Sequence, residues 1–353
     1  MDVVKLLERT ISSNASDLHL VVGLPPMLRI EGELTPIEEK PVTDEESQQM
    51  VFALLTPEQK DLFLVNRELD FSYDHEGKAR FRVNAYHQKG FVSAALRLIP
   101  SQIRTIEELN LPKVFHDFSK LRQGFILVTG PTGHGKSTTL ASIIQEINES
   151  QASHIVTVED PIEYVYPIGR SIVSQRELHS DTHSWEIALR SVLREDPDVV
   201  LIGEMRDYET IAAALTIAET GHLVFATLHT NSAAQTIDRI VDVFPEHQQA
   251  QIRMQLSNTL EAVLSQRLLP SVSGGRIPVA EILLATAAVR TTIREGKTHL
   301  IDNIIQTSAE IGMNTLETSM AYWVKAGKLA LTVATEWALR PADLRRLVRG
   351  GKE

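Results

Sequence analysis

The feature that most constrains this sequence is an eight-residue segment, 130–137, which fits the pattern GxxxxGK[ST]. The apolar run Gly124–Thr129 precedes it and predicts a strand, and a helix is expected from Lys136 onward. In such a strand–loop–helix unit, glycines let consecutive backbone N–H groups point at phosphate oxygens, and the positive end of the new helix faces the same anion. The sequence therefore predicts a phosphate-binding loop in an α/β domain.

The residue types in this loop indicate a nucleotide with its metal, ATP with Mg²⁺. Lys136 is expected to reach the β- and γ-phosphates, and the Ser137 hydroxyl is expected to ligate Mg²⁺. The predicted nucleotide-binding residues of the loop and the helix start are Gly130, Thr132, Gly133, His134, Gly135, Lys136, Ser137 and Thr138. The alternative is a glycine-rich turn that binds no ligand.

A candidate carboxylate for hydrolysis follows another apolar run, in the segment DVVLIGE at 198–204. Hydrolysis needs a carboxylate that orients the attacking water, and Glu204 would lie at the carboxyl edge of the sheet, where open α/β sheets bind ligands. Gly203 occupies the place where many P-loop proteins have a metal-associated aspartate, so the generic motif is incomplete. The alternative is that Glu204 is a surface acid beside Arg206.

The first hundred residues predict a small mixed domain. A short amphipathic helix is expected at 3–11, and Thr43 is a plausible N-cap, with Glu46 three residues on, for helical patterns that continue to about residue 65. The extended segments predicted here are 18–22, Met27–Ile30, and an arginine-rich hairpin of 79–86 and 91–98. The stretch after the hairpin has a proline near each end and a weak pattern, which is typical of a linker. The predicted boundaries are an N-terminal α+β domain at 1–98, a linker at 99–113 and an ATPase domain at 114–353.

After the linker, strand and helix patterns alternate. Such alternation predicts a parallel sheet covered by helices on both faces. The predicted strands are Gly124–Thr129, 155–158, Val199–Ile202, 223–227 and 278–284, and the segments 246–268 and 287–347 carry helical patterns.

Composition excludes several classes of protein. The chain has no cysteine, which excludes disulfides and thiolate metal sites, and its formal charge of −11 argues against a general nucleic-acid binder while leaving a local basic groove possible. It contains no apolar run of 18 residues, so no transmembrane segment is expected. Asp2, Glu8 and Asp17 interrupt the start where a signal peptide would need an apolar core, so we expect a cytoplasmic protein.

Four segments, taken in order, resemble the secretion-ATPase family, and especially the pilus retraction ATPases. They are the loop GPTGHGKST, an acidic box VTVEDPIEY at 156–164, a Walker B form REDPDVVLIGEMRD at 194–207 in which glycine precedes the glutamate, and a histidine box TGHLVFATLHTNSA at 220–233. The resemblance covers nearly the whole chain. It implies a PAS-like N-terminal domain and a RecA-like P-loop ATPase domain with a helical C-terminal extension.

Carried over residue by residue, the resemblance implies roles for the acidic groups. Glu204 would be the catalytic glutamate. Glu159, Asp160 and Glu163 match the acidic box, in which Glu163 would lie near Mg²⁺ and its water.

The resemblance also implies roles for histidines. His222 and His229 match the histidine box, and His229 would face the γ-phosphate, to which a neutral imidazole can donate a hydrogen bond. For either histidine alone, a structural role would be the alternative. His134 stands where the family commonly has serine, and since the loop acts through its backbone we expect only a small effect of this difference.

Positive charge for the transition state is expected from the arginine-rich hairpin, with Arg80, Arg82, Arg97 and Arg104 as candidates. In the family, the N-terminal domain folds over the nucleotide within a hexameric ring. This resemblance favours Arg82 and Arg97, and ordinary solvated arginines are the alternative.

The lack of cysteine also separates branches of the family. Extension-type pilus ATPases and type II secretion ATPases usually insert a four-cysteine zinc module, which this chain cannot form. The segment 288–295 resembles the AIRNLIRE motif of the retraction branch, departing from it at Val289, Thr291 and Thr292.

The resemblance implies a homohexameric motor that powers type IV pilus retraction, and hence twitching motility, from the cytoplasmic side of the inner membrane. Its partners would be an inner-membrane pilus platform protein and either the extension ATPase or a paralogous retraction ATPase. Two alternatives stay open: an extension or secretion motor without the zinc module, and a nucleotide-binding regulatory paralogue that does not hydrolyse ATP.

Overall fold

The computed structural model describes residues 2–30, 32–37, 40–100 and 102–350. The chain divides into two compact units, one of Met1–Gln102 with Pro161–Val165, and one of Ile103–Asp160 with Tyr166–Glu353. The end of the acidic box, at 161–164, thus groups with the first unit, which the sequence did not suggest. The boundaries expected at residues 98 and 113 stay predictions, and Ser101, inside the expected linker, lies outside the described residues.

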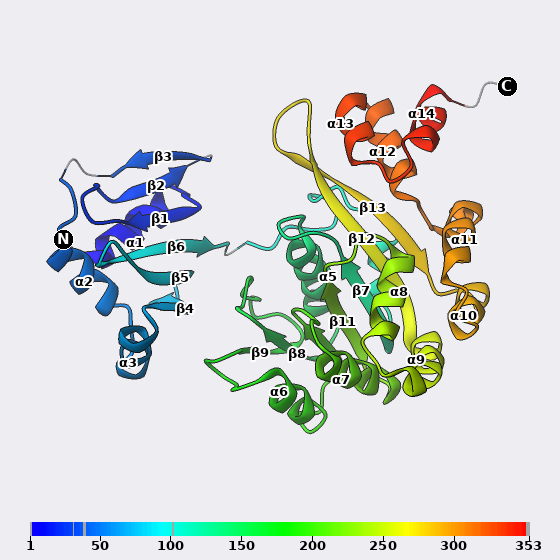
Figure 1. Ribbon diagram of the computed structural model, residues 1–353, viewed down its shortest axis with the longest axis horizontal. Helices are drawn as coiled ribbons and strands as arrows, with labels where there is room; N and C mark the ends of the chain where they lie inside the picture. The colour runs from blue at the N-terminus through cyan, green and yellow to red at the C-terminus, as the bar shows by residue number, and fades with distance from the viewer. Residues whose placement is uncertain (1, 31, 38–39, 101, 351–353) are drawn as a thin grey trace. The chain divides into compact units, whose positions relative to one another are not determined.

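The first unit, blue to cyan in Figure 1, is a mixed α+β domain built on an antiparallel sheet with the strand order β3-β2-β1-β6-β5-β4. Its described elements are α1 (Val3–Ser12), β1 (Asp17–Leu20), β2 (Met27–Ile30), β3 (Glu33–Pro36), α2 (Asp44–Phe52), α3 (Pro57–Asn66), β4 (Glu68–His75), β5 (Ala79–Gln88) and β6 (Phe91–Ile99). Strands β3 and β4 were not expected from the sequence.

Local signals account for the helices of this unit. Thr43 and Glu46 form the expected capping box at the start of α2. A second capping box, between Thr56 and Gln59, starts α3 and explains why the long helical pattern is two helices. Leu7 of α1 and Phe63 of α3 belong to a buried cluster with alternate residues of the central strands, such as Phe81. One face of the sheet is therefore apolar and covered by helices.

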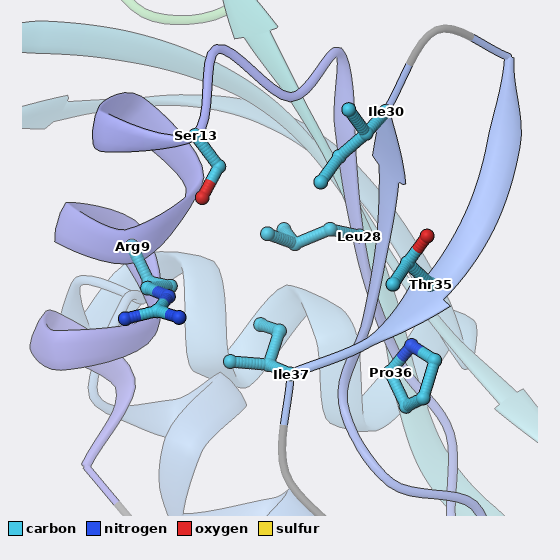
Figure 2. Close-up of a pocket in the computed structure, with 7 residues that line it drawn as sticks. All are labelled: Arg9, Ser13, Leu28, Ile30, Thr35, Pro36 and Ile37. Carbon is cyan, nitrogen blue, oxygen red and sulfur yellow. The ribbon is translucent and has the colours of Figure 1, made fainter.

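A small cavity of about 110 Å³ lies between α1 and the β2–β3 hairpin (Figure 2). Its lining is a mixture of apolar and polar side chains from Arg9, Ser13, Leu28, Ile30, Thr35, Pro36 and Ile37. This volume holds only a few water molecules. We therefore assign it no ligand.

The second unit is a seven-stranded sheet with the order β13-β12-β7-β11-β10-β8-β9. The strands from β12 to β9 in this order all run parallel to one another, and β13 pairs antiparallel with β12 at one edge. The described elements are α4 (Phe115–Phe118), β7 (Gly124–Thr129), α5 (Lys136–Ser150), β8 (His154–Glu159), β9 (Ile172–Glu177), α6 (Trp185–Val192), β10 (Val199–Ile202), α7 (Tyr208–Glu219), β11 (Leu223–Leu228), α8 (Ala233–Asp242), α9 (Glu246–Thr259), β12 (Leu260–Pro270), β13 (Arg276–Leu284), α10 (Ala287–Arg294), η1 (Thr298–Leu300), α11 (Ile301–Thr307), η2 (Ala309–Ile311), α12 (Leu316–Lys325), α13 (Leu331–Trp337) and α14 (Pro341–Arg349).

Both faces of this sheet are buried. Leu127, Val200 and Val224 point into a cluster with residues of α6 to α11. Their neighbours along the strands, such as Ile126 and Phe225, are equally buried and point to the other face, because side chains alternate along a strand. Helix α5 packs against β7 there. The expected parallel sheet with helices on both faces, and the α/β fold class, are confirmed.

One expected helix is wrong. The segment 260–268 was expected to continue a helix from residue 246, but α9 ends at Thr259 and the following residues form β12. Strand β12 lies between β7 and β13 and is buried along almost its whole length. A strand covered on both faces is apolar at nearly every position, so it lacks the alternation that would distinguish it from a helix.

The helices after β13 form the expected C-terminal extension. Leu316, Met320 and Leu344 of α12 and α14 pack on Leu269 and Val279 of the β12–β13 hairpin. Figure 1 shows α12, α13 and α14 gathered beside one end of this hairpin. Among the described residues, no helix combines the length and the apolar character needed to cross a bilayer.

Candidate functional site

The phosphate loop connects the end of β7 to the start of α5, as expected. Gly130, Gly133 and Gly135 have φ values of +139°, +78° and +82°, so the loop curls through backbone conformations that favour glycine. Gly135 is the N-cap of α5. A Cβ at Gly133 would meet no atom within 4 Å, whereas one at Gly130 would lie 2.2 Å from the carbonyl oxygen of Gln266. The loop is thus packed against β12 at its start and open at its middle.

Gln266 holds the loop through its side chain. Its Nε2 donates to the His134 carbonyl oxygen at 3.0 Å, and its Oε1 accepts from the Thr139 hydroxyl in the first turn of α5 at 2.8 Å. Arg276 of β13 donates to the Gly133 carbonyl oxygen at 3.0 Å. The sequence pointed to neither residue, because the strand that carries Gln266 was expected to be a helix and Arg276 precedes the expected strand 278–284.

Lys136 lies buried at the start of α5, with its side chain folded back on the loop. Its Nζ donates to the carbonyl oxygens of Gly130 at 2.9 Å and Pro131 at 3.1 Å, and lies 3.5 Å from Nδ1 of His229. An ammonium group in this position could exchange these two carbonyl oxygens for the oxygens of a phosphate bound in the loop.

Glu204 follows β10 and lies beside His229, which follows β11. The Oε1 of Glu204 is 2.7 Å from Nε2 of His229, and its Oε2 accepts from Arg206 at 2.8 Å. A carboxylate only accepts and an ammonium only donates, so Nε2 of His229 carries the proton toward Glu204, and Nδ1 faces the Lys136 Nζ as acceptor. Because β7, β11 and β10 are neighbours in the sheet, their carboxyl ends bring the lysine, the histidine and the glutamate together.

The charge of Glu204 is fixed by its partners. Burial raises the pKa of this carboxyl, but the hydrogen bonds from Arg206 and His229 and the positive charge of Arg206 outweigh burial, so the pKa is lowered. Glu204 is therefore ionised at neutral pH. Glu204 does contact Arg206, as the alternative of a surface acid expected, but it also contacts His229.

The close approach of β8 and β10 explains why glycine precedes Glu204. A Cβ at Gly203 would lie 3.2 Å from the Glu159 Cα and 3.3 Å from the Val158 carbonyl oxygen, which is tighter than ordinary van der Waals contact. An aspartate in this place would need the two strand ends to separate. Glu204 is consequently the first carboxylate that the β10 end presents.

The acidic box is divided by the structure. Glu159 ends β8 and is buried, with its Oε1 accepting from Thr157 at 2.7 Å and from Gln175 at 3.3 Å. Asp160 comes next and is exposed, close enough to contribute to the field at Arg206. Glu163 belongs to the segment that groups with the first unit. The predicted roles of these acids stay predictions.

His222 is not brought to the phosphate loop. It precedes β11, while His229 follows the same strand, so the two histidines of the box lie at opposite edges of the sheet. Six strand residues at about 3.3 Å each separate the edges by roughly 20 Å. The Nδ1 of His222 instead lies 3.0 Å from the Thr220 hydroxyl and 3.1 Å from the Ile217 carbonyl oxygen, near the end of α7. The nucleotide-binding role that the histidine-box resemblance implies for His222 stays a prediction.

Arg82 and Arg97 lie opposite one another on β5 and β6 of the first unit. Both are exposed on the face of the sheet that turns away from the apolar cluster. Asp17, directly across from Arg97 on β1, accepts from its Nε at 2.9 Å. The structure thus places two like charges side by side on an open polar face, and their predicted catalytic role stays a prediction.

The described residues contain no group of three or more histidine, aspartate or glutamate side chains that could hold a metal ion. Mg²⁺ commonly binds proteins through one or two groups and the phosphates of a substrate. Ser137, which follows Lys136 in the first turn of α5, is the predicted ligand of this kind. The donor set fits a metal that arrives with a nucleotide.

Comparison with known proteins agrees with this site. The family described as type II/IV secretion system protein matches residues 3–274. The type IV pilus retraction ATPase PilT of Pseudomonas aeruginosa is 46% identical over 97% of this chain and 100% of its own length, and a twitching motility protein of Neisseria gonorrhoeae is 46% identical over 93% of this chain and 88% of its own. A crystal structure of the pilus retraction motor PilT with bound ADP superposes with a TM-score of 0.92 at 43% identity, covering 98% of this chain and 99% of that one. This chain therefore belongs to the type II/IV secretion system protein family.

Proposed function

We propose that this chain is an ATP-hydrolysing motor that powers the retraction of type IV pili. The observation that carries the proposal is the convergence of Lys136, His229 and Glu204 beside an open phosphate loop. The names of the two full-length relatives and the ADP in the similar crystal structure support it.

Binding of ATP changes the partners of Lys136. Its ammonium group leaves the carbonyl oxygens of Gly130 and Pro131 and contacts the β- and γ-phosphates, which are stronger acceptors. The loop N–H groups and the start of α5 surround the same phosphates. The Ser137 hydroxyl would hold Mg²⁺ that arrives with ATP, and this metal would supply positive charge that offsets the charge of the phosphates.

Hydrolysis adds water to the γ-phosphorus, breaks its bond to the oxygen that bridges to the β-phosphate, and yields ADP and phosphate. Glu204 accepts a hydrogen bond from the attacking water and orients it. Its lowered pKa suits an orienting acceptor better than a strong base, and phosphoryl transfer depends mainly on positioning and charge. His229, which donates to Glu204 here, can turn that donor to the γ-phosphate when the nucleotide is present.

The proposal extends to residues of the first unit. Arg82 and Arg97 supply positive charge to the transition state, and Glu163 holds Mg²⁺ through a water molecule. An arginine finger can contribute about 10³- to 10⁵-fold in rate and often comes from another domain or subunit. A homohexamer supplies such neighbours.

Phosphate release tests the enzymatic part of the proposal. Glu204→Gln keeps the size of the side chain but removes its charge, and we expect hydrolysis to fall by about 10²-fold or more, the scale of losing one group that stabilises a transition state. Glu209→Gln, an exposed acid in the first turn of α7, is the matched control and should retain the wild-type rate. Equal, slow phosphate release by wild type and Glu204→Gln would instead favour the regulatory paralogue.

The direction of work needs a cellular test. A deletion strain that keeps surface pili but loses twitching motility supports retraction, whereas a strain without pili indicates an extension motor. We place the motor at the cytoplasmic face of the inner membrane, where its partners are the pilus platform protein and the extension ATPase or a paralogous retraction ATPase. Co-purification with the platform protein checks this placement.

A further inference from the structure

One side chain of the phosphate loop reaches from that loop to the C-terminal helices. The Nδ1 of His134 accepts a hydrogen bond from the backbone N–H of Leu268 in β12 at 3.0 Å. Its ring lies 5.5 Å from the ring of Trp337, the last residue of α13, with the planes at 54°. The sequence drew attention only to the backbone of this residue, whereas its side chain makes two specific contacts.

The first contact depends on the different lengths of two strands. Strand β12 pairs with β7 only as far as Ser265, and beyond this residue none of the described strands lies on its β7 side. The backbone N–H of Leu268 would lack the acceptor that a neighbouring strand provides, and the imidazole of His134 supplies it. A serine hydroxyl in this position is one bond shorter and has no ring to place against Trp337.

The same strand also holds the end of α13. Arg267, which is 9% exposed, donates from its guanidinium to the Trp337 carbonyl oxygen at 2.5 Å. Consecutive residues of β12 therefore bind the two parts: Arg267 binds the end of α13, and Leu268 binds the loop. His134 and Trp337 close this connection through their rings.

The protonation state of His134 agrees with the geometry. Burial, and then the charges of Arg267, Arg276 and Lys136, lower the pKa of this histidine. The neutral ring leaves Nδ1 unprotonated, as an acceptor requires.

We propose that His134 is a positioning residue that couples the nucleotide state of the phosphate loop to the C-terminal helices through Trp337. This inference rests on the proposed function, since it needs a nucleotide in the loop. Lys136 must leave two loop carbonyl groups when phosphate binds, and His134 lies two residues before it. Any change that nucleotide binding makes at Trp337 must be matched by an equal effect of Trp337 on nucleotide affinity, because coupling between sites is reciprocal.

A double-mutant cycle on the full chain tests the coupling. The dissociation constant for ADP with Mg²⁺ is measured by calorimetry for wild type, His134→Ser, Trp337→Ala and the double variant. We expect Trp337→Ala to change the affinity by about three- to tenfold in the wild-type background, the scale of an aromatic pair, and by less than about twofold when His134 is already serine. Leu331→Ala, at a similarly exposed position of the same helix, is the matched control and should leave the affinity unchanged in both backgrounds.

Tryptophan fluorescence gives a second measurement, which would not change if His134 only stabilised the fold. Addition of ADP with Mg²⁺ should change the emission of wild type, and Trp337→Phe should remove most of that change. His134→Ser should also remove it while the heat of ADP binding persists. If Trp337→Ala fails to give a native thermal transition, Trp337→Leu takes its place in the cycle.

Two results separate the ways in which this inference can fail. An equal effect of Trp337→Ala in both backgrounds, or an unchanged fluorescence response in His134→Ser, overturns the coupling while leaving nucleotide binding intact. No heat of ADP binding to wild type overturns the proposed function itself, and the coupling with it.

Discussion

Replacing Gly130 by alanine should destabilise the second unit far more than the same change at Gly133. Both glycines have positive φ, a conformation that costs an L-residue about 1–2 kcal/mol. At Gly133 the new methyl group meets no atom within 4 Å, so this cost is the whole effect. At Gly130 it lies 2.2 Å from a backbone oxygen of Gln266, and a forced contact in a packed interior adds about 1–3 kcal/mol or more.

Gly130→Ala should therefore lose about 2–5 kcal/mol, a large share of the stability of a typical domain. Urea unfolding followed by tryptophan fluorescence measures this loss in the second unit alone, because Trp185, Trp323 and Trp337 all belong to it. With ordinary urea dependence, the midpoint should fall by about 1 M or more for Gly130→Ala and by about half as much or less for Gly133→Ala. Equal midpoints for the two variants would refute the close packing of the loop on β12.

Two further predictions concern stability and pH. Burial raises the pKa of Glu281, a residue that is 1% exposed, to about 7. Between about pH 4.5 and 7 the folded state therefore holds a proton that the unfolded state has lost, so the free energy of unfolding falls as pH rises. The variant Glu281→Gln keeps an acceptor for the Ala233 N–H; it should have the melting temperature of wild type near pH 5 and be more stable than wild type by roughly 3 kcal/mol above pH 7. Thermal melts that stay parallel from pH 5 to 8 would contradict this. The ring nitrogens of His116 each lie 2.7 Å from a carboxylate oxygen, one of Glu107 and one of Glu146 on α5. Burial lowers the pKa of His116, but the two carboxylates outweigh burial and raise this pKa. The stabilisation that the protonated ring gives is therefore complete below about pH 6.5 and is lost as pH rises through the raised pKa. The melting temperature of His116→Asn should accordingly approach that of wild type as the buffer is made more alkaline, and a constant gap between the two would exclude the double ion pair.

The sequence predicted the parts of the fold that have strong local signals. The loop motif predicts glycines with positive φ, and the structure has them at Gly130, Gly133 and Gly135. The residues Thr43 and Glu46 predict a capping box at the start of a helix, and the structure has this too. Strand β12 lacked such a signal. Its run LEAVLSQRLLP is apolar on both faces and follows α9 with no glycine or proline between them, so helix and strand fitted equally well. Gln266, which holds the loop, was missed for the same reason, whereas Arg276 lies two residues before the expected strand 278–284.

The candidate site shows both the value and the limit of motif matching. Glu204 and His229 each follow a buried strand, and a parallel sheet brings the ends of such strands together. His222 has the same residue type and lies in the same motif, but the six-residue strand β11 separates it from His229. Because one histidine precedes this predicted strand and the other follows it, the sequence already indicates that they lie at opposite edges of the sheet. Contacts between distant segments, such as the His134 ring with Trp337, have no signal in a single sequence.

ATP hydrolysis by this chain requires Glu204 and Lys136 to face the same nucleotide. A crystal structure with a non-hydrolysable ATP analogue and Mg²⁺ measures this arrangement directly. We predict that Lys136 Nζ leaves the Gly130 and Pro131 carbonyl oxygens for the β- and γ-phosphates, and that the Glu204 carboxylate faces the γ-phosphate with a water molecule between them. An analogue bound away from the loop, or a Glu204 side chain turned toward solvent with no other acid in its place, would contradict the proposed mechanism.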